Sequence, residues 1–129
     1  MPLARIEVPT GKSADYRSTI GEVVYNAMLS VLNVPKNDRF QVITEHSSGH
    51  LVIDPTYLGI ERTKDAIIIQ VTLNEGRTVD MKRAFYKAVA DGLHERLGLR
   101  REDVFINLLE VKKENWSFGN GEAQYVVDQ

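Results

Sequence analysis

The chain has 129 residues, of which 43% are hydrophobic and 26% charged, and its formal net charge is −2. This length and mixture predict one globular domain with a sizeable core, and the absence of cysteine excludes disulfide scaffolds, thiolate zinc sites and cysteine nucleophiles. We find no long basic run, no apolar stretch of about 18 residues and no signal-peptide pattern, so we expect a cytoplasmic protein that binds neither nucleic acid nor a membrane.

The first half of the chain predicts a strand, a helix and a second strand. "PLARIEV" alternates between two faces, as a strand does. Ser13 is a good N-cap for the helix, and Pro35 disfavours helical backbone in the residue before it. The apolar residues of this helix recur at spacings of three and four: Tyr16, Ile20, Val23, Val24, Ala27, Met28, Val31 and Leu32. "RFQVITEH" then predicts the second strand, and "HLVIDP" is a candidate for a short third one.

The second half repeats this order of elements. "AIIIQVTL" is a continuous run rich in β-branched residues, as expected for a strand covered on both faces. Thr78 can cap a second helix, and Gly98 stands where a helix C-terminal glycine belongs. The apolar stripe of that helix comprises Met81, Ala84, Phe85, Ala88, Val89, Leu93 and Leu97. "DVFINLLEV" is the returning strand. The halves share a pattern of elements without a clear residue-by-residue repeat.

These elements predict an α+β fold, a two-layer sandwich of two β-α-β units that span residues 2–45 and 66–110. The tail over residues 112–129 is rich in glycine but carries three aromatic residues, more than a disordered tail usually holds, so we expect it to pack. The strands leave open edges, which proteins usually pair or cover. We therefore expect neighbouring subunits to pair with them.

A strand opened by Pro2, followed by two β-α-β units, resembles the tautomerase superfamily, whose members use an N-terminal proline. The segments "YNAMLSVLNVPKNDRFQVITEH", "LGIERTKDAIII", "RTVDMKRAFYKAV" and "WSFGNGEAQYV" resemble in particular its malonate semialdehyde decarboxylase branch. The resemblance implies a fold like that of macrophage migration inhibitory factor, a homotrimer with one active site at or near each subunit interface, a small carboxylate substrate and no cofactor.

The resemblance also implies roles for individual residues. Pro2 is expected to be the catalytic amine, Asp38 its acidic partner and Arg77 the group that binds the substrate carboxylate. Three aromatic side chains are expected to line the substrate pocket: Trp116, Phe118 and Tyr125. The decarboxylase branch carries an Arg-x-Arg pair before the second helix, whereas "LNEGRT" offers Arg77 alone, with Asn74 and Glu75 nearby. This departure puts malonate semialdehyde in doubt as the substrate.

Pro2 can take part in such chemistry only after Met1 is removed, which leaves a secondary amine with a reference pKa of about 8. As a neutral amine it could act as a general base, and as a cation it could hydrogen-bond to or protonate a carbonyl oxygen. Aromatic walls lower the pKa of such an amine, whereas the carboxylate of Asp38 raises it, and the sequence leaves both outcomes open. We expect Met1 to be absent from the active protein.

Two functions remain open. The first is a cofactor-independent enzyme that catalyses keto-enol tautomerisation, hydration or decarboxylation of a small oxo or unsaturated carboxylic acid. The alternative is a non-catalytic trimeric interaction protein with a vestigial proline. Taken residue by residue, Pro2 could merely open an edge strand and Asp38 could be a turn residue. His46 and His50 in "HSSGH" lack a third ligand, so the sequence predicts no metal site.

Overall fold

The computed structural model describes residues 2–127, and its main elements follow the predicted order. The strands and helices are β1 (Leu3–Pro9), α1 (Ala14–Val31), β2 (Phe40–His46), β3 (Ile67–Asn74), α2 (Val79–Leu97) and β4 (Val104–Val111). β2 and β4 each end one residue beyond the predicted unit. Short 3-10 turns lie at Tyr57–Gly59, Arg101–Asp103 and Lys113–Asn115. No helix within residues 2–127 has the length and apolar character needed to cross a bilayer.

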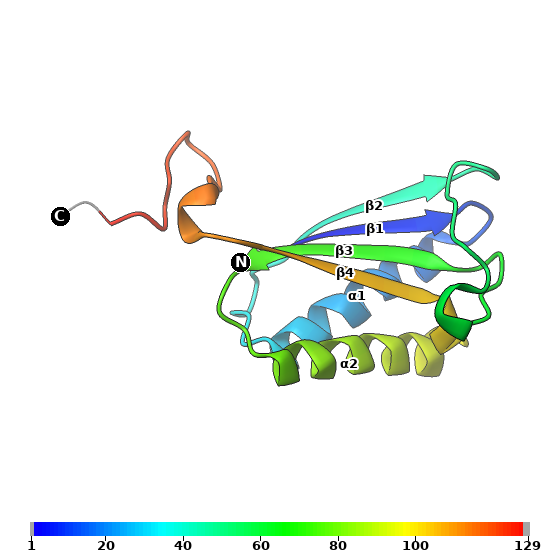
Figure 1. Cartoon of the computed structure of the whole chain (residues 1–129). Coiled ribbons are helices and arrows are strands. Elements are labelled where there is room, and N and C mark those ends of the chain that lie inside the picture. The colour runs from blue at the N-terminus through cyan, green and yellow to red at the C-terminus, as the bar shows by residue number, and fades with distance from the viewer. Residues whose placement is uncertain (1, 128–129) are drawn as a thin grey trace.

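The strands form one sheet in the order β2-β1-β3-β4. The two strands of each unit are parallel, and β1 and β3 are antiparallel. Both helices cover the same face of the sheet, and the opposite face is uncovered in the single chain (Figure 1). The predicted two-layer α+β fold is therefore confirmed.

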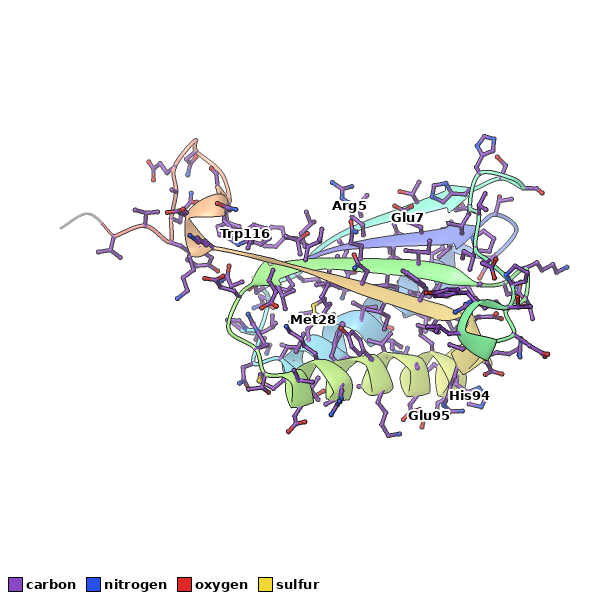
Figure 2. All side chains as sticks on the ribbon, in the orientation of Figure 1. Arg5, Glu7, Met28, His94, Glu95 and Trp116 are labelled. Atoms are coloured by element: carbon purple, nitrogen blue, oxygen red, sulfur yellow. The ribbon has the colours of Figure 1, made fainter. Side chains whose placement is uncertain are left out.

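The core lies between the sheet and the two helices, and Figure 2 shows Met28 of α1 within this layer. The side chains of Ile6, Ile69 and Phe85 have no exposed surface, and burial of each such side chain contributes roughly 1.5–3 kcal/mol. Figure 2 also shows Arg5 and Glu7 on the uncovered face of β1. The alternation predicted for β1 therefore divides core from open face.

The predicted helix ends are confirmed. The hydroxyl of Ser13 accepts a hydrogen bond from the backbone N–H of Tyr16 (3.0 Å), and the hydroxyl of Thr78 accepts one from Met81 (3.1 Å). Gly98 ends α2 in the left-handed conformation at φ 67°, which glycine adopts without the penalty that a Cβ would bring.

One detail of the prediction is wrong, and another is not met within the single chain. Residues 50–55 form no strand, because the Asp54 carboxylate accepts hydrogen bonds from the backbone N–H groups of Thr56 (2.9 Å) and Tyr57 (2.8 Å) and holds the chain in a turn. β3 is covered on one face only: alternate residues are buried against the helices, whereas Ile68 and Gln70 are half-exposed on the open face. The second cover predicted for β3 is absent from the single chain.

The two units also correspond residue by residue, contrary to the sequence interpretation. The N-caps Ser13 and Thr78 stand 65 positions apart, and so do two turn glycines with positive φ, Gly11 at 100° and Gly76 at 120°. Most of the matched positions carry different residues, so the repeat is not visible in the sequence.

Strand pairing follows the same repeat. Leu3 pairs with Phe40 in the first unit, and Ile68 pairs with Phe105, each 65 positions later, in the second. In the antiparallel pair of β1 and β3, Arg5 lies opposite Gln70, again 65 positions on. A pseudo-twofold axis therefore passes between Arg5 and Gln70, and it exchanges the two ends of the sheet.

Candidate active site

The predicted site residues come together at one end of the sheet, where β1 and β2 begin and β3 and β4 end. We call this the Pro2 end. Pro2 directly precedes β1, Asp38 precedes β2, Arg77 follows β3, and the aromatic tail follows β4. Figure 1 shows the N-terminus and the tail at this same end of the molecule.

Pro2 is buried and leads into Leu3, which pairs with Phe40 on one side and Thr72 on the other. β1 is thus an inner strand, so the alternative in which Pro2 opens an edge strand is wrong. Met1 lies outside the described residues, and its removal stays a prediction.

Asp38 is the least expected side chain of the site. It is only 7% exposed, and neither carboxylate oxygen has a hydrogen-bond partner within residues 2–127. Burial raises the pKa of Asp38, and the positive charge of Arg77 opposes that rise. Its backbone N–H donates to the Pro35 carbonyl (3.1 Å), so the turn needs its backbone and not its carboxylate. A buried carboxylate without partners is costly, which favours a functional role over a structural one.

Arg77 is fixed by backbone carbonyls and is not a freely solvated charge. Its Nε and Nη2 donate to the carbonyl of Leu32 (3.2 and 3.0 Å), and its Nη1 donates to the carbonyl of Asn74 (3.1 Å). A guanidinium has five N–H donors, so two remain without a partner among the described residues. The arrangement holds the cation in one place and leaves part of its fork free for an anion.

The three predicted aromatic residues pack together with a fourth, Phe40. The rings of Trp116 and Phe118 stack at 5.5 Å and 10°, and Tyr125 meets Phe118 edge-on at 5.1 Å. Phe40 lies 5.9 Å from Phe118, measured between ring centroids. The tail therefore packs as predicted, and it contacts the start of β2 through Phe40.

Asn74 anchors this aromatic cluster. Its Oδ1 accepts a hydrogen bond of 2.7 Å from the indole Nε1 of Trp116, and its backbone carbonyl accepts from Arg77. Sequence reasoning placed Asn74 near the missing arginine but assigned it no role. Phe40 was missed because it follows the strand pattern. The one signal for Asn74 in the sequence was a polar residue at the end of an apolar strand.

Charge links the tail to the other site residues. Burial raises the pKa of the Tyr125 phenol, the carboxylate of Asp38 raises it further, and Arg77 lowers it. The Pro2 end therefore combines a buried carboxyl, a fixed cation and an aromatic wall beside the start of the chain. Such a set suits proton transfer on a small anion. No cluster of three His, Asp or Glu side chains suited to a metal ion occurs in residues 2–127.

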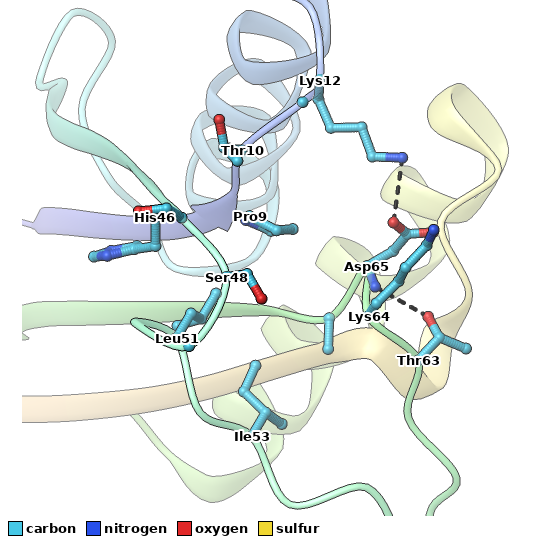
Figure 3. A pocket seen from close by; sticks show the side chains of 14 residues that line it. Pro9, Thr10, Lys12, His46, Ser48, Leu51, Ile53, Thr63, Lys64 and Asp65 are labelled. Atoms are coloured by element: carbon cyan, nitrogen blue, oxygen red, sulfur yellow. Dashed lines mark hydrogen bonds and ion pairs between the residues drawn. The ribbon is translucent and has the colours of Figure 1, made fainter.

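A cavity of about 520 Å³ lies elsewhere, at the opposite end of the sheet. We call this the Lys12 end, after a lysine in the turn that follows β1 (Figure 3). The carboxylate in its lining, that of Asp65, is paired with Lys12, so this cavity supplies no unpartnered carboxyl of the kind that Asp38 presents within residues 2–127.

Comparison with known proteins identifies the family. Two family models, each described as "Tautomerase enzyme", match residues 38–119 and 2–60. The chain belongs to the tautomerase family. It is 40% identical over 126 residues, 98% of this chain and 99% of the relative, to the probable tautomerase YusQ of Bacillus subtilis (strain 168).

Solved structures agree with this family. A malonate semialdehyde decarboxylase inhibited by 3-bromopropiolate is 35% identical, with a TM-score of 0.89 over 95% of this chain and 93% of that one. A fused 4-OT, a symmetric trimer, shares the fold at 19% identity and a TM-score of 0.76 over 93% of this chain and 94% of that one. The predicted tautomerase-superfamily enzyme is confirmed at this level, and the exact reaction is undetermined.

Proposed function

We propose that this enzyme uses the free amine of Pro2 to move a proton on a small oxo or unsaturated carboxylic acid, with Asp38 and Arg77 as its partners. The observation that carries the proposal is the buried carboxyl of Asp38, which has no hydrogen-bond partner within residues 2–127 and whose pKa is lowered by the charge of Arg77 against the effect of burial. A side chain kept in so costly a state is expected to act on a ligand.

Arg77 orients the substrate. Its two remaining N–H donors can form charge-assisted hydrogen bonds to a carboxylate, and its bonds to backbone carbonyls leave it little freedom to lose on binding. The stacked aromatic rings supply a wall that excludes water and strengthens these electrostatic contacts. Trp116, Phe118 and Tyr125 thus form the substrate-binding side of the pocket.

Pro2 and Asp38 handle the protons. In ketonisation of an enol, the hydroxyl loses one proton and the neighbouring carbon gains one, and the Pro2 nitrogen can accept the first and deliver the second. Asp38 in its protonated form, which burial favours, can donate a hydrogen bond to the carbonyl oxygen that develops. In its ionised form it can position a water for hydration of an unsaturated acid.

Decarboxylation of malonate semialdehyde is the weaker candidate for the main reaction. The chain is similar to a malonate semialdehyde decarboxylase over most of its length, yet it has Arg77 without the first arginine of the Arg-x-Arg pair. Pairing a cation tightly with the carboxylate that must leave also opposes loss of carbon dioxide. We therefore place tautomerisation or hydration ahead of decarboxylation.

The active assembly is a homotrimer in this proposal. The uncovered sheet face and its edge strands carry four large apolar side chains that are 40–46% exposed: Phe40, Val42, Phe105 and Leu109. Half-exposed residues of β3 on the same face support a second cover from neighbouring subunits. Sedimentation at micromolar protein is expected to show a trimer, and a stable monomer would contradict this assembly.

The test of the function is the state of the N-terminus. Preparations with and without Met1 are separated, verified by intact mass and assayed on phenylenolpyruvate. An amide at Pro2 has neither a basic lone pair nor an ammonium proton, so the form that retains Met1 is expected to be folded and inactive. Pro2→Ala keeps a primary amine and is expected to retain reduced activity. Full turnover with Met1 in place would remove Pro2 from the mechanism and favour the vestigial-proline alternative.

A further inference from the structure

The cavity at the Lys12 end is the pseudosymmetric counterpart of the candidate active site. Three segments line it: the turn after β1 (residues 9–12), the loop after β2 (46–53) and the chain before β3 (63–66). The pseudo-twofold axis between Arg5 and Gln70 exchanges this end of the sheet with the Pro2 end.

The 65-residue repeat matches the site residues of the two ends. Lys12 stands 65 positions before Arg77, in the same β-to-α turn and directly after a positive-φ glycine. Asp103 stands 65 positions after Asp38, and Ile67 stands 65 positions after Pro2. The cation is thus retained at the Lys12 end, whereas the chain continues through Ile67 and offers no terminal amine.

The counterpart aspartate is occupied. The Asp103 carboxylate accepts a 2.7 Å hydrogen bond from the backbone N–H of Thr63 and another from the Thr63 hydroxyl. It is 1% exposed, so it holds the loop before β3 and presents no free oxygen to the cavity. The Lys12 end therefore lacks both groups needed for proton transfer while it keeps a cavity and a cation.

We propose that this cavity is a second, non-catalytic binding site for a small carboxylate. Lys12 and Lys64 bring two positive charges to the lining, against the single negative charge of Asp65. Lys64 has no ion-pair partner within the described residues, and Figure 3 shows the hydroxyl of Ser48 directed toward the space between Pro9 and the 63–65 segment. These cations and hydroxyls suit a carboxylate group.

The cavity also has an apolar side for the carbon chain of such a ligand. Leu51, Ile53 and Ala66 contribute to its lining, and Figure 3 shows Ile53 facing the cavity from below the β1 turn. Lys12 pairs with Asp65 at 3.3 Å, and both side chains are more than a third exposed, so a carboxylate can take the place of Asp65 at little cost. Small polar groups with one apolar side fit this site better than a nucleotide or a metal ion.

Site-resolved titration tests the proposal. The full chain, labelled with ¹⁵N, is titrated with sodium propionate at ionic strength held constant with sodium chloride. Saturable amide shifts are expected in residues 9–12, 46–49 and 63–66, with a Kd in the range of about 1–10 mM. The double variant Lys12→Gln/Lys64→Gln is expected to weaken this Kd by about tenfold or more. The control Lys87→Gln, on the outer face of α2, is expected to change nothing.

The same experiment separates this inference from the proposed function. Arg77→Ala is expected to abolish shifts at the Pro2 end and to leave those at the Lys12 end in place. Binding at the Lys12 end that is absent, does not saturate, or survives the double variant unchanged would overturn the proposal. Equal shifts with inorganic phosphate or chloride in place of propionate would also overturn it, because the cavity would then hold any anion.

Discussion

The two ends of the sheet share one strand register and matching turn glycines, and their buried aspartates differ in hydrogen bonding. Asp38 and Asp103 each donate their backbone N–H to the carbonyl three residues earlier, at 3.1 and 2.9 Å. The carboxylate of Asp103 accepts two hydrogen bonds from Thr63, whereas that of Asp38 has no partner in residues 2–127. One aspartate stabilises a loop, and we propose that the other acts on a ligand. The lesson is that the partner, not the position, decides the role.

The cations of the two ends differ in the same way. Three N–H donors of Arg77 bind backbone carbonyls, which fixes its guanidinium at the Pro2 end. Lys12 pairs instead with Asp65 and lies over the ring of Tyr16 at 5.4 Å from its centroid. A fixed, forked donor suits orientation of a reacting substrate, whereas a flexible ammonium suits loose binding.

The largest effect on kcat/KM among these substitutions is expected when the cation at each end is replaced in turn. Arg77→Ala removes a charge-assisted contact worth about 2–3 kcal/mol and is expected to lower kcat/KM for a carboxylate substrate by roughly 30- to 150-fold, mainly through KM. The matched variant Lys12→Ala, at the equivalent position, is expected to leave kcat/KM within about twofold. Steady-state kinetics on phenylenolpyruvate measures both. Equal losses in the two variants, or an equal loss with a neutral analogue, would show that Arg77 does not bind the carboxylate.

A smaller effect is expected at Asn74, which ties Trp116 to the Pro2 end. Asn74→Ala removes a neutral hydrogen bond worth about 1 kcal/mol and is expected to raise KM about fivefold with little change in kcat. Trp116→Phe keeps an aromatic ring without the N–H donor and is expected to act in the same direction.

Because both variants break one interaction, the double variant is expected to cost little more than either single one. Indole fluorescence of the Asn74→Ala protein reports on the position of Trp116 independently of activity. Fully additive losses would contradict a shared hydrogen bond.

Much of the fold could be predicted from local pattern. The alternation of β1, the apolar stripes and the caps Ser13 and Thr78 depend on neighbouring residues, and all are found as expected. The cover of the second face of β3 could not be assigned from the sequence, because the apolar run of this strand is the same whether that cover comes from its own chain or from a neighbouring subunit. Its open face becomes interpretable only beside the other strands.

The sequence predicted residues that the fold gathers at the Pro2 end, but it could not show how their contacts differ from those at the Lys12 end. Asp38 in "VPKNDRF" and Asp103 in "LRREDVF" have similar neighbours in the sequence, which does not distinguish them. Thr63, whose hydrogen bonds occupy the Asp103 carboxylate, lies 40 residues from Asp103 in a loop without periodicity. The tie between Asn74 and Trp116 likewise joins residues 42 apart. Long-range partners of single polar atoms leave no regular trace in a sequence.

The sign of a pH effect follows from the raised pKa of Asp38. The folded protein binds this proton more tightly than the unfolded chain, so ionisation of Asp38 costs stability as pH rises from the ordinary range of aspartate through the raised value. Replacing Asp38 by Asn removes this cost and is therefore expected to increase stability by about 1 kcal/mol at pH 7. The gain is expected to disappear in acid, where Asp38 of the natural chain is protonated in both the folded and the unfolded state.

The most direct measurement is the free energy of unfolding of Asp38→Asn and Asp103→Asn at pH 7, at a fixed protomer concentration, with turnover recorded on the same samples. The account predicts that Asp38→Asn is more stable than the natural chain and loses about a hundredfold or more in turnover. It predicts that Asp103→Asn loses about 2 kcal/mol of stability and retains its turnover, because a carboxylate that holds Thr63 has been weakened. Equal destabilisation by the two substitutions, or loss of turnover in Asp103→Asn alone, would contradict the division of roles between the two ends.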